Sequence, residues 1–297
     1  KKNYKTVITS RSSKKKNHIL SFFKNKKNLF YYVLNIGKKK EIEKLVKKFT
    51  PSEIYFFAGQ SSVSKSFHKK KETILSNYNG CKNFLDVMIK NKINCKFLNA
   101  SSCEIYGNIN KKIKINHKKK PISPYGLSKL KSFNLVKNYR KKFSIKGFNA
   151  IIFNTESIFR DKNYLIPKIC MAAIRAKKYN KKTDFGNLKI AREWNWGPEQ
   201  VFYLFKFLNK KPQDFILSNG KNYKATEMLK FAFNYFNLDY KKFVYKKKKY
   251  YRKKDIISSR SDWKNCLKRN RLKRVPKIYG RKLINNMIFH YLNEFKN

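Results

Sequence analysis

The sequence predicts an α/β protein with an open parallel sheet and a smaller lobe formed by the C-terminal part of the chain. Stretches typical of buried strands alternate with amphipathic helices up to about residue 155, and a helix-rich pattern follows. The 297 residues are 41% hydrophobic and 16% aromatic, enough to bury a full core. Because no Gly/Ser-rich linker separates the two parts, we expect them to be interleaved.

The elements are predicted in chain order from apolar spacing. Runs typical of strands occupy residues 4–11, 30–36, 54–58, 96–101 and 148–154. Apolar residues at i, i+3, i+4 and i+7 predict a helix over 42–49, and a long helix is expected over 73–90. A further helix opens at Tyr125 and continues through Val136, Tyr139 and Phe143. Amphipathic helices are expected at 226–238 and 281–295, with apolar stripes that form core or subunit contacts.

The charge is strongly positive, with 73 Lys and Arg against 17 Asp and Glu, a formal +56. Such a surface attracts nucleic acid and other polyanions, so nucleic-acid binding is an obvious rival function. The lysines are spread over the expected turns and helix faces and form no single arm or stripe. Lys, Asn, Ile, Tyr and Phe are abundant together, and a bias towards A/T-rich codons would produce this composition. We therefore expect no specific nucleic-acid partner.

Targeting and metal-binding signals are not found in the sequence. No run approaches the roughly 18 apolar residues of a membrane span, and the first residues lack the apolar core of a signal peptide. We therefore expect a cytoplasmic protein without membrane contact. The cysteines lack C-x-x-C spacing and the four histidines are dispersed, so neither disulfides nor a metal site is predicted. The cysteines are Cys81, Cys95, Cys103, Cys170 and Cys266.

Tyr125 and Lys129 form a candidate catalytic pair. Four residues apart on a helix, they lie one turn apart on the same face, so the ammonium group can approach the phenol. A nearby cation favours phenolate and would lower the pKa of Tyr125 towards that of a working proton acceptor. With 19 tyrosines and many lysines, the chain also produces Tyr-x-x-x-Lys by chance, so the pair needs support from its surroundings.

The strand expected at 96–101 provides that support. It runs into Ser102 and Glu104, and open α/β sheets place ligand groups at the carboxyl ends of their strands. A hydroxyl and a carboxylate there, followed by a helix that carries Tyr125 and Lys129, predict an acid/base cluster. Cys103 lies between them on extended backbone, so its side chain is expected to point away and to pack in the core.

Four blocks extend this pattern over nearly the whole chain. Residues 51–63 (PSEIYFFAGQSSV) are similar to a strand and cofactor loop, and residues 100–107 to a Thr-x-Glu segment with Ser102 in place of Thr. Residues 154–157 are similar to an Asn-His-Glu-Ser block with Thr155 in place of His, and residues 192–194 to an Arg-Asp-Trp segment. In this set and order the chain resembles the extended short-chain dehydrogenase/reductase family and, within it, the GDP-mannose 4,6-dehydratases.

The resemblance implies a Rossmann-like doubly wound parallel sheet. Residues 1–155 would bind NADP, and residues 156–297 would form mainly the substrate lobe, with part of 186–210 returning to the first domain. The first strand and its Gly-rich phosphate loop would be missing, since the chain contains no such fingerprint and begins with Lys1. Either the chain is a fragment of a longer product, which we favour because the catalytic residues are present, or it is a decayed, inactive homologue.

The same resemblance implies site residues. The catalytic set would be Ser102, Glu104, Tyr125 and Lys129. Arg11 would contact the 2′-phosphate of NADP, because a guanidinium binds phosphate bidentately, and Asn35 stands where the family usually carries Asp near the adenine. The cofactor contacts would be Arg11, Asn35, Ala58, Gln60, Tyr125, Lys129, Thr155 and Arg160. The substrate contacts would be Asn154, Lys168, Arg192 and Arg252.

The implied reaction converts GDP-mannose to GDP-4-keto-6-deoxymannose through NADP. Tyr125 would take the proton of the sugar 4-hydroxyl, Ser102 would hydrogen-bond the 4-oxygen, and Glu104 would remove the C5 proton and help expel the 6-hydroxyl as water. One alternative is a related nucleotide-sugar epimerase or 4-reductase, which needs no C5 base and which Thr155 would favour. Another is an inactive polyanion-binding homologue. The resemblance also implies a homo-oligomer, a dimer or tetramer.

Overall fold

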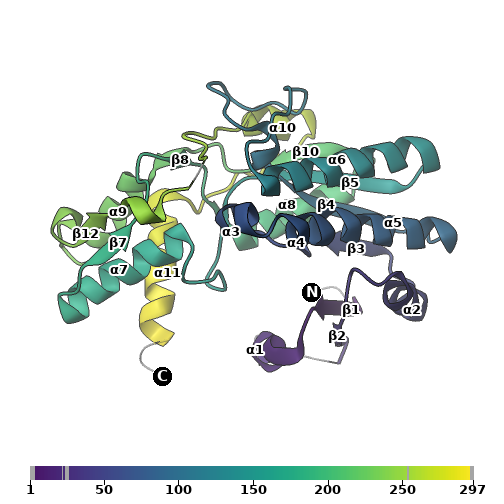
Figure 1. Ribbon diagram of the computed structural model, residues 1–297, viewed down its shortest axis with the longest axis horizontal. Coiled ribbons are helices and arrows are strands. Elements are labelled where there is room, and N and C mark those ends of the chain that lie inside the picture. The colour runs from purple at the N-terminus through teal and green to yellow at the C-terminus, as the bar shows by residue number, and fades with distance from the viewer. Residues whose placement is uncertain (1–3, 22, 24–26, 253, 295–297) are drawn as a thin grey trace.

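A four-stranded parallel sheet forms the centre of the computed structural model, which describes residues 4–21, 23, 27–252 and 254–294 (Figure 1). The strands lie in the order β10 (Asp214–Leu217), β5 (Lys146–Ile152), β4 (Lys96–Ser102) and β3 (Glu53–Phe56). The parallel pairing of β4 with β5 runs from Lys96 opposite Lys146 to Ser102 opposite Ile152. Parallel strands joined by helices are the α/β architecture that the sequence predicts, so the fold class is confirmed.

Helices bury β4 on both faces. Phe97 packs in one core cluster with residues of α2 (Lys39–Phe49) and α5 (Gly80–Lys90). Leu98 points the other way, into a second cluster with α8 (Gly197–Leu208), β10 and α10 (Trp263–Arg269). Helix α6 (Pro124–Phe143) lies along β4 and β5. Residues of α8, β10 and α10 thus join the core of the main sheet although they come from the C-terminal half of the chain.

Two strands form a separate parallel pair at the N-terminal end of the chain. β1 (Thr6–Ser10) pairs with β2 (Leu29–Val33), and β1 is the strand of this pair nearer to β3 in Figure 1. Within the described residues, no ladder of hydrogen bonds joins β1 to β3. A 3-10 turn (Ser13–Lys15) and helix α1 (Lys16–Ser21) lie between β1 and β2. On α2, Ile42 and Val46 are buried, in agreement with the predicted apolar spacing, and Phe49 packs on Phe30 of β2.

The helix expected over residues 73–90 is interrupted. Helix α4 (Lys70–Ile74) passes into a π-helical turn (Leu75–Asn79), and α5 then continues to Lys90. The hydroxyls of Thr73 and Ser76 donate to the backbone oxygens of Lys69 and Glu72, at 2.7 and 2.8 Å. Such back-bonding competes with the helical ladder and bends helices. The short helix α3 (Val63–His68) precedes this run.

The C-terminal lobe is built on three helices, α7 (Leu165–Tyr179), α9 (Ala225–Asn234) and α11 (Gly280–Glu294), which share one core cluster (Figure 1). On α11, Leu283, Ile284, Met287, Ile288 and Tyr291 are fully buried, so the predicted stripe is core. Three short pairs complete the lobe and its junction: β6 (Thr155–Glu156) with β9 (Asn195–Trp196), β7 (Thr183–Phe185) with β12 (Val244–Lys246), and β8 (Ala191–Arg192) with β11 (Tyr223–Lys224). Further 3-10 turns are Cys103–Tyr106, Tyr240–Lys242 and Lys248–Tyr250.

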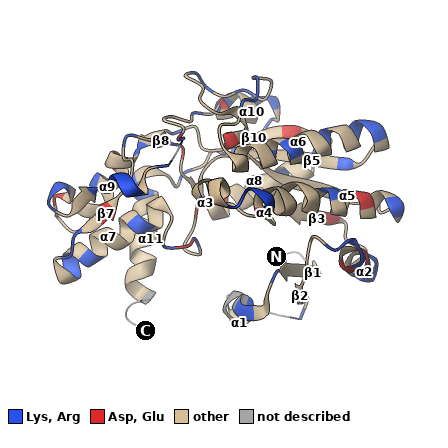
Figure 2. Cartoon of the chain, in the orientation of Figure 1, with Lys and Arg blue, Asp and Glu red and all other residues tan. Residues whose placement is uncertain are grey.

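Basic residues cover both parts of the fold. Figure 2 shows Lys and Arg on helices and loops of the main sheet and of the lobe, without a single arm or stripe. This distribution agrees with the spread that the sequence predicts. Every helix in the described ranges is too short or too polar to cross a lipid bilayer.

Candidate functional site

The carboxyl end of β4 provides the first half of the site. The strand ends at Ser102, and a 3-10 turn starts at Cys103, where the backbone N–H of Glu104 donates to Ser102 Oγ at 3.2 Å. Cys103 is 4% exposed and packs in the core beside α8 and β10, which confirms its predicted structural role. Burial raises the pKa of its thiol to about 12, so it is a poor nucleophile.

The first turn of α6 provides the second half. Ser123 caps the helix by accepting a hydrogen bond from Gly126 N–H at 3.0 Å, and Pro124 occupies the first turn. A Cβ on Gly126 would lie 2.7 Å from the backbone oxygen of Glu104. Only glycine therefore lets the helix start this close to the strand-end turn. The predicted juxtaposition of Glu104 and Tyr125 depends on this contact.

Tyr125 has a higher pKa than the sequence argument expects. Burial raises the pKa of the phenol, and this effect outweighs a hydrogen bond with Ser102 that lowers it. We expected Lys129 to lower the pKa of Tyr125, and this expectation is wrong for the structure, because the amine forms a hydrogen bond to a backbone oxygen instead. Lys129 Nζ donates to Ala100 O at 2.9 Å and lies 5.9 Å from the centre of the Tyr125 ring. Burial also lowers the pKa of Lys129 to about 8.

Glu104 is the second titratable group of the cluster. Burial raises the pKa of its carboxyl, the charges of Arg192 and Arg252 lower it, and the charge of Asp255 raises it. Within the described ranges, no donor forms a hydrogen bond to its carboxylate. An unbonded, mostly buried carboxylate beside a tyrosine can accept a proton from a bound molecule.

The two arginines near Glu104 share one carboxylate. Asp255 Oδ1 accepts from Arg192 at 3.3 Å and from Arg252 at 3.2 Å. Arg192 is 3% exposed, and it also donates to the backbone oxygens of Ala191, Ile256 and Ile257. Arg192 therefore fixes the segment 255–257 beside Glu104 and keeps few free donors, whereas Arg252 is half-exposed.

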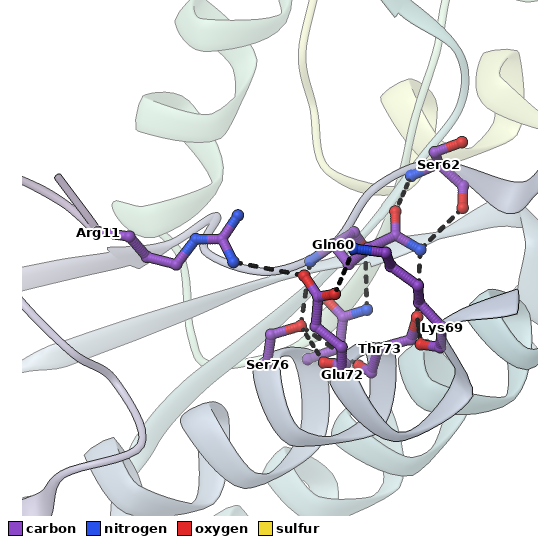
Figure 3. A network of polar contacts seen from close by, with 8 residues as sticks. Arg11, Gln60, Ser62, Lys69, Glu72, Thr73 and Ser76 are labelled. Atoms are coloured by element: carbon purple, nitrogen blue, oxygen red, sulfur yellow. Dashed lines mark hydrogen bonds and ion pairs between the residues drawn. The ribbon is translucent and has the colours of Figure 1, made fainter. Parts of the chain in front are cut away.

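The loop of residues 59–62 follows β3 and is anchored on the interrupted helix. Gln60 N–H donates to Ser76 Oγ and Gln60 Nε2 to Thr73 Oγ1, both at 3.1 Å (Figure 3). Asn77 Nδ2 donates to Gln60 O and to Ser128 Oγ on α6, each at 3.0 Å. The loop is thereby tied to the helix that carries Tyr125.

Gly59 lies in the expected cofactor loop, and its neighbour Asn77 is a residue that the sequence analysis missed. Gly59 has φ +130°, and a Cβ there would lie 2.0 Å from Asn77 Oδ1, so glycine is required. Asn77 Oδ1 is buried without a hydrogen-bond partner. The run Ser76-Asn77-Tyr78-Asn79-Gly80, rich in weak helix formers, is the signal in the sequence. A π-helical turn is often found at functional sites.

Three of the predicted cofactor contacts, Arg11, Asn35 and Ala58, have local partners in the structure. Arg11 pairs with Glu72 of α4 at 3.4 Å, and its side chain is 78% exposed (Figure 3). Asn35 Oδ1 accepts from Gly37 N–H at 2.9 Å, so the amide caps its own turn. Ala58 is half-buried against the cluster under α5.

The block at residues 154–160 lies beside the lobe. Asn154 O accepts two hydrogen bonds from Asn195, both at 2.8 Å, and Thr155 Oγ1 donates to Phe153 O at 3.1 Å. Arg160 is close enough to Tyr125 for its charge to lower the pKa of that phenol. Arg160 therefore lies within electrostatic range of Tyr125, and its contact with the cofactor stays a prediction.

Lys168 lies in a different place. It lines an open hollow with Arg175, Lys181, Lys182 and Tyr250, and its Nζ lies 4.9 Å from the Tyr250 ring centre. None of the four predicted catalytic residues lines this hollow. Burial lowers the pKa of Lys168.

Glu193 is a buried carboxylate that holds three chain segments together. It accepts hydrogen bonds from Ser261 N–H at 2.7 Å, from Gly220 N–H at 3.3 Å and from the hydroxyls of Ser218 and Ser261. Burial raises the pKa of its carboxyl. The described residues contain no group of three His, Cys, Asp or Glu side chains placed to hold a metal ion.

Comparisons with known proteins agree on one family. The model of the GDP-mannose 4,6 dehydratase family matches residues 1–276. GDP-mannose 4,6 dehydratase 1 of Arabidopsis thaliana is 28% identical over 244 residues, which cover 80% of this chain and 67% of the relative. The chain spans about half to two thirds of the length of the curated relatives it matches.

Solved structures of low identity share the fold. DesIV (dTDP-glucose 4,6-dehydratase) from Streptomyces venezuelae, with NAD and TYD bound, has a TM-score of 0.85 at 16% identity, over 97% of this chain and 88% of that one. RMD from Pseudomonas aeruginosa, complexed with NADPH, has a TM-score of 0.79 at 15% identity, over 97% and 99% of the two chains. At these identities the likeness shows the fold alone.

Proposed function

The chain belongs to the GDP-mannose 4,6 dehydratase family, and we propose that the protein converts GDP-mannose to GDP-4-keto-6-deoxymannose. The observation that carries the proposal is the buried carboxyl group of Glu104. Its charge raises the pKa of the Tyr125 phenol, and Ser102 forms a hydrogen bond with the same phenol. Oxidation at one sugar carbon needs only the hydroxyl base, whereas loss of water also needs a base for the neighbouring C5 proton. A site with both groups fits a dehydratase better than a plain epimerase or reductase.

NADP is the cofactor of this proposal, and when bound it would supply the oxidation at C4 and the reduction at C6. The residues present fit such a group. The Arg11 side chain is 78% exposed with one ion pair, so it retains donors for a 2′-phosphate. Lys129 spends one of its three donors on Ala100, which leaves two for cofactor hydroxyls. Arg160 adds a cation beside Tyr125.

Tyr125 would accept the proton of the sugar 4-hydroxyl, while Ser102 hydrogen-bonds the same oxygen. Because burial raises the pKa of Tyr125, the phenolate needs nearby positive charge in order to form. Arg160 provides such a charge, whereas Lys129 donates to Ala100 O and does not lower the pKa of Tyr125 in this structure. Arg160 therefore acts by favouring the charged form of the base.

Glu104 would remove the C5 proton once C4 is a ketone. The electron pair of the C5–H bond forms a C5–C6 double bond, the C6–O bond breaks, and the proton held by Glu104 leaves with the 6-hydroxyl as water. When C6 is reduced, C5 takes up a proton from solvent, and Tyr125 returns the proton of the 4-hydroxyl to solvent. Burial suits Glu104 to both tasks, since a raised pKa makes the carboxyl a better proton acceptor near neutral pH.

The cations of the lobe would bind the diphosphate of the substrate. Arg252 retains donors for phosphate oxygens, whereas Arg192 would act mainly by fixing the segment 255–257. A contact of Lys168 with the substrate is less well supported, because none of the predicted catalytic residues lines its hollow. The epimerase and 4-reductase alternatives are not favoured by the family match. A homo-oligomer and a cytoplasmic location remain predictions of this proposal.

The test is an assay of the complete natural protein with GDP-mannose and NADP. We expect a 4-keto-6-deoxy product that disappears in Glu104→Gln, while binding of GDP-mannose is kept. Glu43→Gln on α2 is the matched control and should retain activity, because Glu43 forms its ion pairs with Lys47 and Lys90 at the surface. Product from the Glu104→Gln variant at the wild-type rate would refute the role of Glu104. An epimerised or reduced sugar would refute the dehydratase.

A further inference from the structure

One hydrogen bond joins the 59–62 loop to the segment 157–164 that precedes α7. Ser61 Oγ and the Tyr164 hydroxyl lie 3.1 Å apart, although 103 positions separate them in the chain. The loop follows β3 of the main sheet, whereas Tyr164 is the N-cap residue of α7 in the lobe. The contact therefore bridges the two parts of the fold.

The loop side of this bridge is firmly held. Gln60 bonds to Ser76 and Thr73, and its backbone oxygen accepts from Asn77 (Figure 3). Ser62 N–H in turn donates to the side chain of Gln60. Four contacts thus hold Gln60 and Ser62, the two neighbours of Ser61 in the loop.

The ring of Tyr164 also packs against the guanidinium of Arg160. The guanidinium carbon of Arg160 lies 4.0 Å from the centre of the Tyr164 ring, which is a cation–π stacking distance. The segment turns between the two residues, since Arg160 N–H donates to Ser157 O at 3.1 Å and Tyr164 N–H to Asp161 O at 3.0 Å. Arg160 and Tyr164 thus stack within one short turn, and the hydrogen bond between Ser61 and Tyr164 holds the C-terminal end of that turn.

The carboxylate of Glu156 lies close to the guanidinium of Arg160 but does not fix its orientation. Arg160 Nε lies 3.1 Å from Glu156 Oε2, yet both atoms are buried and neither makes an aligned hydrogen bond. An ion pair without good geometry attracts the guanidinium but does not orient it. The orientation of Arg160 therefore depends on the aromatic ring.

We infer that Tyr164 is a positioning residue of the site: its hydroxyl fastens the lobe segment to the 59–62 loop, and its ring holds Arg160 beside the Tyr125 phenol. The inference deepens the proposed function and rests on it, because it gives Arg160 a task towards the reacting tyrosine and the cofactor. It also predicts that Ser61 and Tyr164 act as one unit. Loss of either hydroxyl loosens both segments.

Hydrogen exchange measured by mass spectrometry tests the bridge without any turnover. A neutral hydrogen bond contributes enough that Tyr164→Phe or Ser61→Ala should speed exchange in peptides covering 57–64 and 157–166 by about two- to tenfold. The double variant should exchange no faster than the single ones. The control is Tyr179→Phe, the same substitution at the exposed last residue of α7, which should leave exchange unchanged.

Steady-state kinetics of the same variants tests the positioning role. Tyr164→Phe should raise KM for NADP about two- to tenfold and change kcat less than twofold. Tyr164→Leu, which also removes the stacking, should raise KM about two- to fivefold further. It should also move the pH–rate limb of Tyr125 upwards, because a displaced Arg160 no longer lowers the pKa of that phenol.

The outcomes separate the two proposals. Faster exchange in the Tyr164 and Ser61 variants, in a protein that does not act on GDP-mannose, would support the bridge and refute the proposed function. Normal dehydratase turnover with Tyr164→Phe exchanging like Tyr179→Phe would refute the bridge alone. Exchange effects of Tyr164→Phe and Ser61→Ala that add in the double variant would also refute it, because the residues would then act separately.

Discussion

Glu156→Gln should make the protein more stable at neutral pH. Glu156 lies in β6 with 2% of its surface exposed, and burial raises the pKa of its carboxyl from 4.5 to about 7 although Arg160 opposes the shift. Between these two pH values the folded chain holds a proton that the unfolded chain has lost. The folded state therefore binds more protons, and stability falls as the pH rises through this window.

The size of the effect follows from the shift. A difference of roughly 2.5 pKa units corresponds to about 3 kcal/mol of unfolding free energy, fully lost only above pH 7. Glutamine has the shape of the protonated acid and cannot ionise. The variant should match the wild type near pH 4 and exceed its stability by up to about 3 kcal/mol at pH 8.

Urea unfolding at a series of pH values measures this difference. Glu43→Gln is the control with the opposite sign, because hydrogen bonds from Lys47 and Lys90 lower the pKa of Glu43. There the wild type becomes more stable relative to the variant as the pH rises towards the ordinary carboxyl pKa of 4.5, and the difference is complete above it. A Glu156→Gln curve parallel to the wild type from pH 4 to pH 8 would refute the burial argument.

Three further predictions concern the same core. Gly126→Ala places a Cβ 2.7 Å from Glu104 O, so the free energy of unfolding, measured by thermal unfolding, should fall by about 1–3 kcal/mol. Wild type should gain stability as the pH rises from about 8 to 10.5, because folded Lys129 loses its proton before the unfolded chain does. Urea unfolding of Lys129→Met should lack this gain of about 3 kcal/mol. Glu193→Ala leaves buried serine and glycine donors unpaired and should cost about 3–5 kcal/mol by urea unfolding; a loss below about 1 kcal/mol would contradict that.

Much of the fold could be predicted because its signals are local. The apolar spacing of α2 and α11 and the buried run of β4 depend on near neighbours in the chain, and each occurs within a few residues of its predicted place. The meeting of Glu104 with Tyr125 was also predictable. It follows from the rule that ligand groups lie at the carboxyl ends of parallel strands.

The rest depends on contacts between distant segments. The pKa of Tyr125 is set by how deeply the phenol is buried, and Lys129 turns to Ala100, a strand residue 29 positions away. The π-helical turn at Asn77 depends on bonds to Gln60 and Ser128. No periodicity in the sequence encodes such partners, since helical spacing is the same with or without them.

The division between the β1–β2 pair and the main sheet bears on solubility. Edge strands expose unpaired backbone groups that can template pairing with another copy of the chain, which is the first step of aggregation. Tyr55 in β3 and Phe57 just after it are 39% and 52% exposed, so apolar surface at the β3 edge favours association with another copy. The formal charge of +56 keeps copies apart over about 10 Å at 0.1 M salt, and screening shortens that reach. Added salt should thus turn a dispersed protein into one that associates through its strand edges.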